Sequence, residues 1–214
     1  MKRVVPIVPT IIVALAVLMM VRLGFWQLHR LHEKEALLAR YSANAAKPPS
    51  PFAALFPIGD DDLYRRTSAY CLNVVKWQAE AGRASDGTPG WRHIASCRTG
   101  AEGPGITVDM GVSADAVAPA WTGGGVSGRL TQAPNGQSLA ARLFRRPAVA
   151  APMIVSDAAA PGLKPTAQPN PSDIPNNHLA YAVQWFLFAA VALIIYAIAL
   201  WQRARKVALP PPPR

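Results

Sequence analysis

The stretch from Tyr181 to Trp201 reads YAVQWFLFAAVALIIYAIALW, and Gln184 is its one strongly polar residue. Its length is close to the roughly 20 residues that an α-helix needs to cross the hydrocarbon core of a bilayer. Lipid offers the backbone no hydrogen-bond partners, so a single span of this kind must be helical. Residues 178–201 are therefore predicted to form a transmembrane helix.

A second apolar block runs from Val4 to Val21 and is broken only by two prolines and a threonine. It predicts another transmembrane helix over residues 4–22. The alternative is a cleaved signal peptide, which requires a small-residue cleavage site directly after the apolar run. Arg22 and Trp26 stand there instead, so a retained anchor is the favoured interpretation.

The charged residues predict how the chain crosses the membrane. Lys2 and Arg3 precede the first block, four basic residues follow the second, and all twelve acidic residues lie between the blocks. Basic tails stay in the cytoplasm, whereas long loops are translocated whatever their charge. The tails 1–3 and 202–214 are thus predicted to be cytoplasmic. The net charge of +10 is explained by this topology and forms no basic stripe, so no nucleic-acid partner is expected.

The compartment follows from the same pattern. The sequence has no Arg- and Ser-rich transit peptide, which would be typical of import into an organelle. A multi-pass protein of a bacterial inner membrane is therefore predicted, with the central segment in the periplasm.

That central segment begins with a predicted juxtamembrane helix over residues 23–47. Leucine, glutamate, lysine and alanine recur there at helical spacing, and the prolines after Lys47 end the pattern. Residues 48–157 then change to short apolar runs separated by Gly and Pro, which predicts a β-rich domain. Residues 158–177 contain five prolines and are predicted to be an extended linker.

Five runs are predicted to be strands: Leu63–Gln78, Trp91–Arg98, Ile106–Ser113, Val126–Thr131 and Met153–Ser156. In Ile106–Met110, apolar and polar residues alternate as in a half-buried strand. Several short strands at this spacing are typical of an antiparallel sheet or a partly open barrel. The predicted fold is an α+β membrane protein, in which two transmembrane helices flank an exported, mainly antiparallel β domain.

The two cysteines, Cys71 and Cys97, both fall in predicted strands. An oxidising compartment permits a disulfide between them, and two buried free thiols are the alternative. They do not form a Cys-x-x-Cys motif, so a thiol oxidoreductase is not supported.

The sequence contains no recognisable catalytic motif. It lacks a Gly-x-Ser-x-Gly elbow, a phosphate-binding glycine loop and a His-Glu-x-x-His metal motif. Asp60–Asp62 is a run of three carboxylates, which is more often a solvated turn than an ion site. The chain is therefore predicted not to be an enzyme. An exported enzyme would require a cluster such as Asp109, His93 and Cys97 around one pocket.

His178 is the most informative of the four histidines because it stands directly before the second apolar block. Pro175 stops any earlier helix and Asn177 is a good N-cap residue, so His178 would be the first helical residue. The positive end of the helix dipole favours a neutral imidazole there, which is the form that ligates iron. Tyr181 and Trp185 follow on the same helix face. An aromatic belt at the membrane interface is the simpler explanation of this series.

Two stretches at opposite ends of the chain resemble the Surfeit locus protein 1 family. Residues 23–30 read LGFWQLHR, with Lys34 one turn later, and match the family's Leu-Gly-x-Trp-Gln-Leu-x-Arg pattern. Residues 175–186 read PNNHLAYAVQWF and match its Asn-Asn-His-Leu-x-Tyr-Ala-x-x-Trp-Phe signature. Residues 126–130 (VSGRL) resemble a later strand of the family. Residues 108–112 (VDMGV) keep only the valine and glycine of its Val-x-Arg-Gly-Trp strand.

The resemblance implies an assembly factor for haem-copper cytochrome c oxidase that handles haem a for the catalytic subunit. His178 then becomes the candidate haem-iron ligand, and Tyr181, Trp185 and Trp26 become candidate contacts of the cofactor. His29 or His32 could supply a second axial ligand. The implied partners are the oxidase catalytic subunit, haem a synthase and the membrane. The alternative is a cofactor-free membrane scaffold that holds these partners by close helix packing at small residues, namely Ala182, Ala189 and Ala190.

Overall fold

The computed structural model describes residues 5–100, 105–134 and 151–208, which form two compact units. The first, called here the helix pair, consists of residues 1–37 and 175–214 as far as they are described. The second, the β unit, is Leu38–Ile174. The tail predicted at 1–3 and the end of the tail predicted at 202–214 lie outside the described residues.

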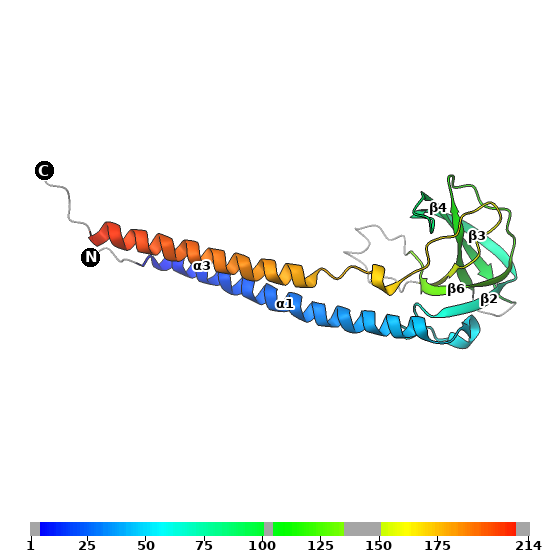
Figure 1. The fold of residues 1–214 in the computed structure, drawn as a ribbon, viewed down its shortest axis with the longest axis horizontal. Coiled ribbons are helices and arrows are strands. Elements are labelled where there is room, and N and C mark those ends of the chain that lie inside the picture. The colour runs from blue at the N-terminus through cyan, green and yellow to red at the C-terminus, as the bar shows by residue number, and fades with distance from the viewer. Residues whose placement is uncertain (1–4, 101–104, 135–150, 209–214) are drawn as a thin grey trace. The chain divides into compact units, whose positions relative to one another are not determined.

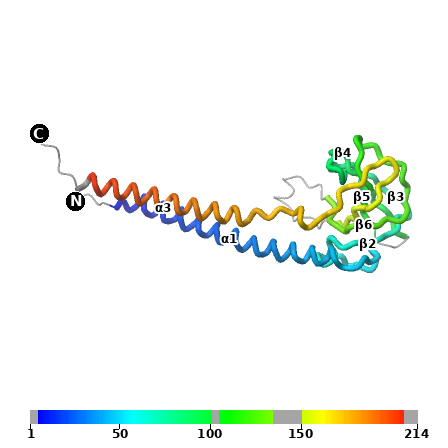
Figure 2. Tube along the Cα trace, viewed as in Figure 1, coloured from blue at the N-terminus to red at the C-terminus, as the bar shows by residue number. Residues whose placement is uncertain are grey.

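Two long helices dominate the chain (Figures 1 and 2). Helix α1 runs from Ile7 to Ala46 and helix α3 from His178 to Ala208. The continuation of the first helix past its apolar block is thus confirmed, and it ends where the proline-rich segment begins, since proline removes a backbone donor and cannot continue the helix. Both helices are long and apolar enough to cross a membrane, which is compatible with a membrane protein of two spans.

The β unit is built on one seven-stranded sheet with the strand order β1-β2-β6-β7-β5-β4-β3. The described part of this unit also contains two short 3-10 helices outside the sheet, Phe52–Leu55 and Pro171–Asp173. The strands are β1 Ser50–Pro51, β2 Arg66–Cys71, β3 Asn73–Arg83, β4 Pro89–Arg98, β5 Ile106–Ser113, β6 Gly124–Gln132 and β7 Pro152–Ser156.

The prediction of a mainly antiparallel sheet is wrong, because the sheet is mixed. Strand β7 lies between β6 and β5, and it pairs antiparallel with β6 but parallel with β5. Strand β1 also pairs parallel with β2. Side-chain alternation along a strand reports which face is buried and carries no information on the direction of its neighbours, so the sequence pattern could not reveal this.

The run predicted as one strand, Leu63–Gln78, is divided between two strands. Strand β2 ends at Cys71 and β3 begins at Asn73, with Leu72 as the only residue between them. These two strands lie near opposite ends of the sheet order, so the sheet must curl until the end of β2 meets the start of β3. The backbone N–H of Leu72 donates a hydrogen bond of 2.8 Å to the carbonyl of Arg98 in β4, across the closing edge.

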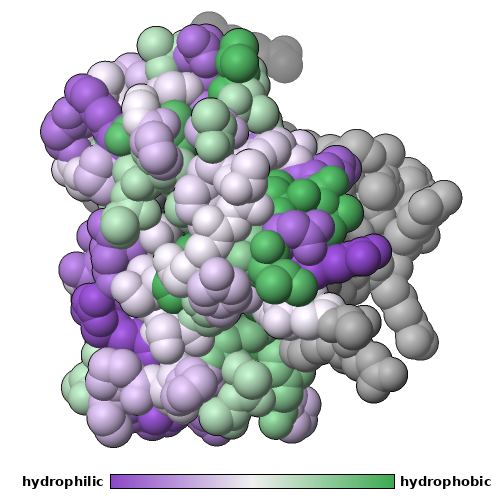
Figure 3. All heavy atoms as spheres, turned by 90° about the vertical axis from the view of Figure 1, so that its right-hand side faces the viewer, coloured by the Kyte–Doolittle hydropathy of each residue, from purple (hydrophilic) through white to green (hydrophobic). Residues whose placement is uncertain are grey.

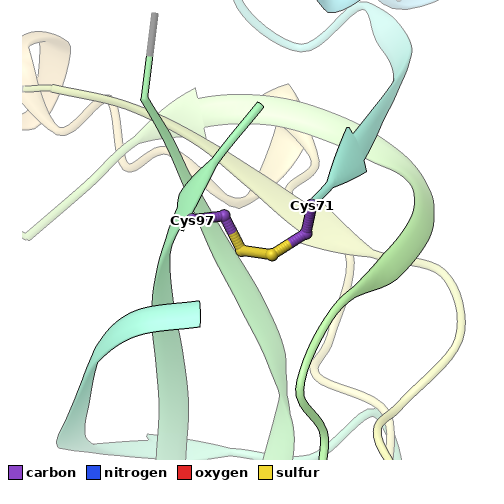
Figure 4. Close-up of a disulfide and its surroundings, with 2 residues drawn as sticks. All are labelled: Cys71 and Cys97. Atoms are coloured by element: carbon purple, nitrogen blue, oxygen red, sulfur yellow. A yellow bond between two sulfur atoms is a disulfide. The ribbon is translucent and has the colours of Figure 1, made fainter. Parts of the chain in front are cut away.

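A disulfide joins the curled sheet at the same place (Figure 4). Cys71, at the end of β2, is bonded to Cys97 in β4, with their Cα atoms 5.3 Å apart. Both residues are buried. Of the two alternatives that the sequence left open, the structure has the disulfide.

The centre of the sheet is buried on both faces. Four of the five residues of β7 and six of the eight residues of β5 are buried, and Leu130, Ile154 and Val108 have no exposed surface. The prediction that Ile106–Met110 is half-buried is therefore wrong. Of its two polar residues, Asp109 is fully buried, because the proline-rich segment after β7 covers that face, and Thr107 is partly buried.

We call residues 158–174 the strap. The strap overlaps the linker predicted at 158–177; it includes a turn at 161–162 and the 3-10 helix Pro171–Asp173, and it is hydrogen bonded to the sheet. Lys164 exchanges both backbone hydrogen bonds with Val112 of β5, at 2.8 and 2.9 Å. Gly111 lies under the strap with φ +124°, and a Cβ atom there would be 2.6 Å from the carbonyl oxygen of Lys164. Only glycine fits this position, which explains the glycine in the middle of β5.

Asp109 is the polar centre of this packing. Its carboxylate accepts hydrogen bonds from Arg92 Nε at 2.8 Å, from the Thr166 hydroxyl at 2.8 Å and from the backbone N–H of Gly111 at 3.1 Å. The Nη2 atom of Arg92 is 2.6 Å from the same carboxylate. A buried charge needs this degree of pairing, and the bond from Thr166 attaches the strap to the sheet.

Candidate functional site

The predicted start of the second helix is confirmed. Helix α3 begins at His178, and the backbone N–H of Tyr181 donates to the carbonyl of Asn177 at 3.2 Å. That bond is the first of the helix, so Asn177 occupies the cap position and His178 is the first helical residue. The first turn of α3 contains no acidic residue.

The side chain that meets His178 comes from the other end of the chain. Nδ1 of His178 donates a hydrogen bond of 2.7 Å to Oε1 of Gln27 in α1. An amide oxygen can only accept, so the proton of a neutral imidazole is placed on Nδ1 and the lone pair is on Nε2. Metal-bound histidines are commonly oriented in this way, by a hydrogen bond from their second ring nitrogen.

Small and aromatic residues near this contact set the distance between the two helices. Gly24 is buried, and a Cβ atom added to it would lie 2.6 Å from the ring of Phe186. The ring of Phe25 meets Phe186 edge-on, with centroids 5.4 Å apart. The absence of a side chain at residue 24 therefore allows Phe186 to pack against α1. The two helices then lie close enough for Gln27 and His178 to form their hydrogen bond.

A second polar contact joins the helices far from His178. The hydroxyl groups of Thr10 and Tyr196 are hydrogen bonded to each other, so α1 and α3 run antiparallel. Along the face between them, Ala182 and Ala189 are buried, as expected for small residues at a close helix contact. Ala190, which was expected to take part in the same close packing, is exposed.

The structure distributes the predicted aromatic residues around the His178 contact without bringing their rings onto the imidazole. Trp26 neighbours Gln27 on α1 and is 51% exposed. Tyr181 is half-exposed on α3, and Trp185 is partly buried with its ring against Phe188, at a centroid distance of 6.1 Å. Gln27 is the residue that sequence reasoning missed. One feature of the sequence could have pointed to it: Gln27, within LGFWQLHR, is a polar residue near the end of the first apolar block.

Among the described contacts, neither histidine considered as a second axial ligand is hydrogen bonded to His178 or Gln27. Nε2 of His29 lies 3.1 Å from the carboxylate of Glu33, one turn along α1, and His32 is exposed on the same helix. Within the described ranges, no group of three or more His, Cys, Asp or Glu side chains is arranged to bind a metal ion.

The cluster required by the enzyme hypothesis does not form. Cys97 is in the disulfide, and Asp109 is paired with Arg92 and Thr166. His93 is buried elsewhere, with Nε2 2.7 Å from the Ser113 hydroxyl and its ring against Trp77. These three side chains therefore have separate partners.

The fold and the histidine contact together define a class of protein: two long apolar helices joined by polar contacts, with a β unit between them in the sequence. The chain belongs to the SURF1 family, whose family model matches residues 14–190. The matched range contains both the LGFWQLHR stretch and the His178 segment. This family is known for cytochrome c oxidase assembly. No curated protein matches the chain.

Proposed function

We propose that this chain is a membrane-anchored assembly factor that binds haem a through His178 and presents it to the catalytic subunit of a haem-copper cytochrome c oxidase. The hydrogen bond between His178 and Gln27 is the observation that supports this proposal. It fixes the ring and leaves the lone pair of Nε2 available for iron. Haem a is the cargo, and its iron would accept the imidazole lone pair.

The surrounding residues suit a large aromatic ligand. Trp26 and Tyr181 each expose about half of their surface, and they flank the two residues that form the polar contact. Aromatic side chains of this kind provide apolar contact area together with a polar tip. Their exposed rings would contact the faces or edges of a porphyrin bound at His178.

Release of the cargo is favoured by the small number of ligands. His29 is paired with Glu33 on α1, and in this proposal His178 would be the single ligand that the described residues supply at this contact. A single protein ligand leaves the second axial position for a receiving protein. The same reasoning makes the oxidase catalytic subunit, with haem a synthase as donor, the expected partners.

The membrane location is part of the proposal. In each apolar span, only 6% of the residues of the most apolar window are buried, so the apolar surface of the helices faces outward, as a lipid environment requires. The disulfide between Cys71 and Cys97 supports an oxidising compartment for the β unit. A bacterial inner membrane, with both termini cytoplasmic and the β unit periplasmic, fits these observations.

The test is an absorption spectrum of the full chain purified in mild detergent after co-expression with haem a synthase. The native chain should carry a haem a spectrum and His178→Ala should lose it, because the iron ligand is absent. Gln184→Ala, a polar-to-alanine change on the same helix, is the matched control and should keep the spectrum. A colourless native chain from membranes rich in haem a would overturn the proposal.

Gln27 provides a second test that leaves the ligand in place. Gln27→Leu removes the acceptor for Nδ1, so the ring can rotate and exchange its tautomers. We expect weaker haem a retention, by about 10-fold to 100-fold, as is usual when the group that orients a metal-bound histidine is lost. Gln27→Glu keeps an oxygen acceptor and should retain more haem a than Gln27→Leu.

A cofactor-free scaffold is the second candidate, supported by the outward apolar surface of both helices. A scaffold would bind the oxidase subunit or haem a synthase through these faces. It predicts that His178→Ala supports oxidase assembly as well as the native chain, provided that helix α3 is intact by circular dichroism. Assembly that fails with His178→Ala and succeeds with Gln184→Ala would argue against the scaffold.

A further inference from the structure

The far end of the helix pair from His178 contains a groove that the haem a proposal does not use. It has a volume of about 400 Å³ and lies between the start of α1 and the last turns of α3. Six of its lining residues carry the argument: Pro6, Pro9, Tyr196, Leu200, Arg203 and Lys206. Tyr196, one of these residues, is hydrogen bonded to Thr10 of α1.

The position of the groove follows from the lengths of the two helices. Helix α1 begins at Ile7, and Thr10 in its first turn pairs with Tyr196. Helix α3 continues for three more turns past Tyr196, to Ala208. Tyr196, Leu200 and Arg203 are spaced so that they share one helix face, and this face is the one turned towards α1. The basic side chains therefore flank the groove rather than the opposite side of the helix.

The groove is strongly basic and has no acidic neighbour in the sequence. Helix α3 contains no Asp or Glu, and the first acidic residue of α1 is Glu33. Arg203 and Lys206 are both exposed, and within the described part of the chain neither forms an ion pair. Two unneutralised cations beside a groove attract an anionic group.

The surface next to the groove is apolar. Four isoleucines on the two helices, close in the sequence to residues that line the groove, are exposed: Ile7, Ile11, Ile195 and Ile198. Trp201 is exposed as well, and the guanidinium of Arg205 lies 4.0 Å above its ring. Tryptophan and basic residues at the end of an apolar helix are typical of the boundary between hydrocarbon and headgroups.

The combination of features determines which anion fits. A soluble anion would use the cations and leave the adjoining isoleucines exposed to water. An anionic glycerophospholipid uses both, since its phosphate reaches the cations while its acyl chains lie along the apolar helix faces. Basic pockets between transmembrane helices are known to bind such headgroups.

We infer that the groove between the start of α1 and the end of α3 is a binding site for an anionic glycerophospholipid, with Arg203 and Lys206 contacting the phosphate. The inference rests on the proposal that both helices span a membrane. It is independent of haem a, because the groove and the His178 contact lie at opposite ends of the helix pair. The bound lipid would occupy this groove and fix the separation of the helices there.

The experiment measures which lipids remain bound to the full chain. The protein is purified in a neutral detergent, mixed with equal amounts of phosphatidylglycerol and phosphatidylcholine, and examined by native mass spectrometry. The native chain should retain phosphatidylglycerol preferentially. Arg203→Gln should lower that preference about fivefold, since one basic residue at an anionic surface contributes about 1 kcal/mol. The double variant Arg203→Gln/Lys206→Gln should abolish it.

Arg205→Gln is the matched control, because it removes one positive charge from the same helical turn. Arg205 stacks on Trp201 instead of lining the groove, so the lipid preference should change less than twofold. An equal loss in Arg205→Gln and Arg203→Gln would overturn the inference, since the preference would then reflect net charge alone. An unchanged preference in the double variant would also overturn it.

A separate measurement distinguishes failure of this inference from failure of its premise. Native membranes are washed with alkaline carbonate, which removes proteins that do not span the bilayer. A native chain that is extracted would contradict the membrane proposal and the lipid site together. A chain that stays in the membrane, keeps its haem a spectrum and shows no lipid preference would contradict the lipid site alone.

Discussion

The helix pair and the β unit place their apolar residues in opposite ways. In the β unit, Leu130, Val108 and Ile154 have no exposed surface, and apolar and hydrophilic residues are intermingled on the face shown in Figure 3. In the helix pair, large apolar residues such as Leu15, Leu187 and Ile195 are more than half exposed. The contacts described between the helices involve Gly24 with the rings of Phe25 and Phe186, two buried alanines and two polar pairs.

This difference shows what stabilises each unit. Water drives the apolar residues of the β unit into its core. In the lipid environment proposed for the two helices, burying leucine would gain nothing, and close packing and hydrogen bonds would hold the helices together. Consequently a polar contact such as that between Gln27 and His178 contributes a larger fraction of the stability of the helix pair than it would contribute to the β unit. The same contact is available for function.

The largest effect on stability is expected from the disulfide. Replacing both cysteines, Cys71→Ala/Cys97→Ala, should destabilise the β unit by about 3–4 kcal/mol, because the bond closes a loop with a sequence separation of 26 residues. The measurement is unfolding by guanidinium in mild detergent, followed by near-ultraviolet circular dichroism.

The helix pair should not respond to this change, since both cysteines belong to the β unit. Reduction of the native chain with dithiothreitol is the control and should give the same loss of stability. Equal stability of the double variant and the native chain would show that the curled sheet closes without the bond.

An intermediate effect is expected at Gly24. Gly24→Leu places a side chain where Phe186 packs, so the helices must separate, at a cost of about 1–3 kcal/mol. The measurement is the distance between spin labels at Leu18 and Leu193, which are both exposed, as sodium dodecyl sulfate is added.

Two variants sharpen this prediction. Ala16→Leu adds the same side chain at an exposed position of α1 and should leave the labels together. Gly24→Leu/Phe186→Ala removes the ring that the new leucine side chain would strike, and it should restore part of the pairing. If Gly24→Leu behaves like Ala16→Leu, the close approach at Phe186 is not what sets the helix spacing.

The smallest effect is expected at an exposed ion pair between the strap and the turn before β4. The Nζ atom of Lys164 lies 2.8 Å from the carboxylate of Asp86. Hydrogen bonds from Lys164 and then from Thr88 hold the pKa of Asp86 well below its ordinary value of 3.8. A carboxyl whose pKa is lowered by folding stabilises the folded state above that ordinary value, and the contribution is lost as the pH falls below it.

Asp86→Ala should therefore be slightly less stable than the native chain near neutral pH, and the difference should shrink as the pH is lowered from about 5 to about 2. Thermal unfolding of the β unit across this range provides the measurement. Lys164→Gln should show the same convergence. A difference that is constant with pH would mean that the pair does not contribute through its charge.

The sequence predicted the parts of this protein that depend on neighbours in the chain. Pro175 and Asn177 predicted that α3 begins at His178, and the apolar runs predicted both long helices. The runs assigned to strands correspond to β2 through β7, although Leu72 divides the first of them. Each of these features follows from local spacing or from the backbone preferences of proline and asparagine.

The candidate site was predicted only in part for the same reason. His178 was recognisable because its signal lies in the adjacent residues. Gln27 was not, because it is 151 positions away in the chain and nothing near it specifies its partner. The burial of Asp109 was missed likewise, since the strap that covers it follows β7 and cannot be inferred from alternation within β5.

The sequence by itself therefore determined the two apolar helices, the strand segments, the start of α3 and the residues that match the family. Tertiary structure alone decided the mixed strand order, the bond between Cys71 and Cys97, and the residue that orients His178. The physical reason is the range of the interactions. Periodicity and capping act over a few residues, whereas strand partners, side-chain partners and burial depend on segments that meet only when the chain is folded.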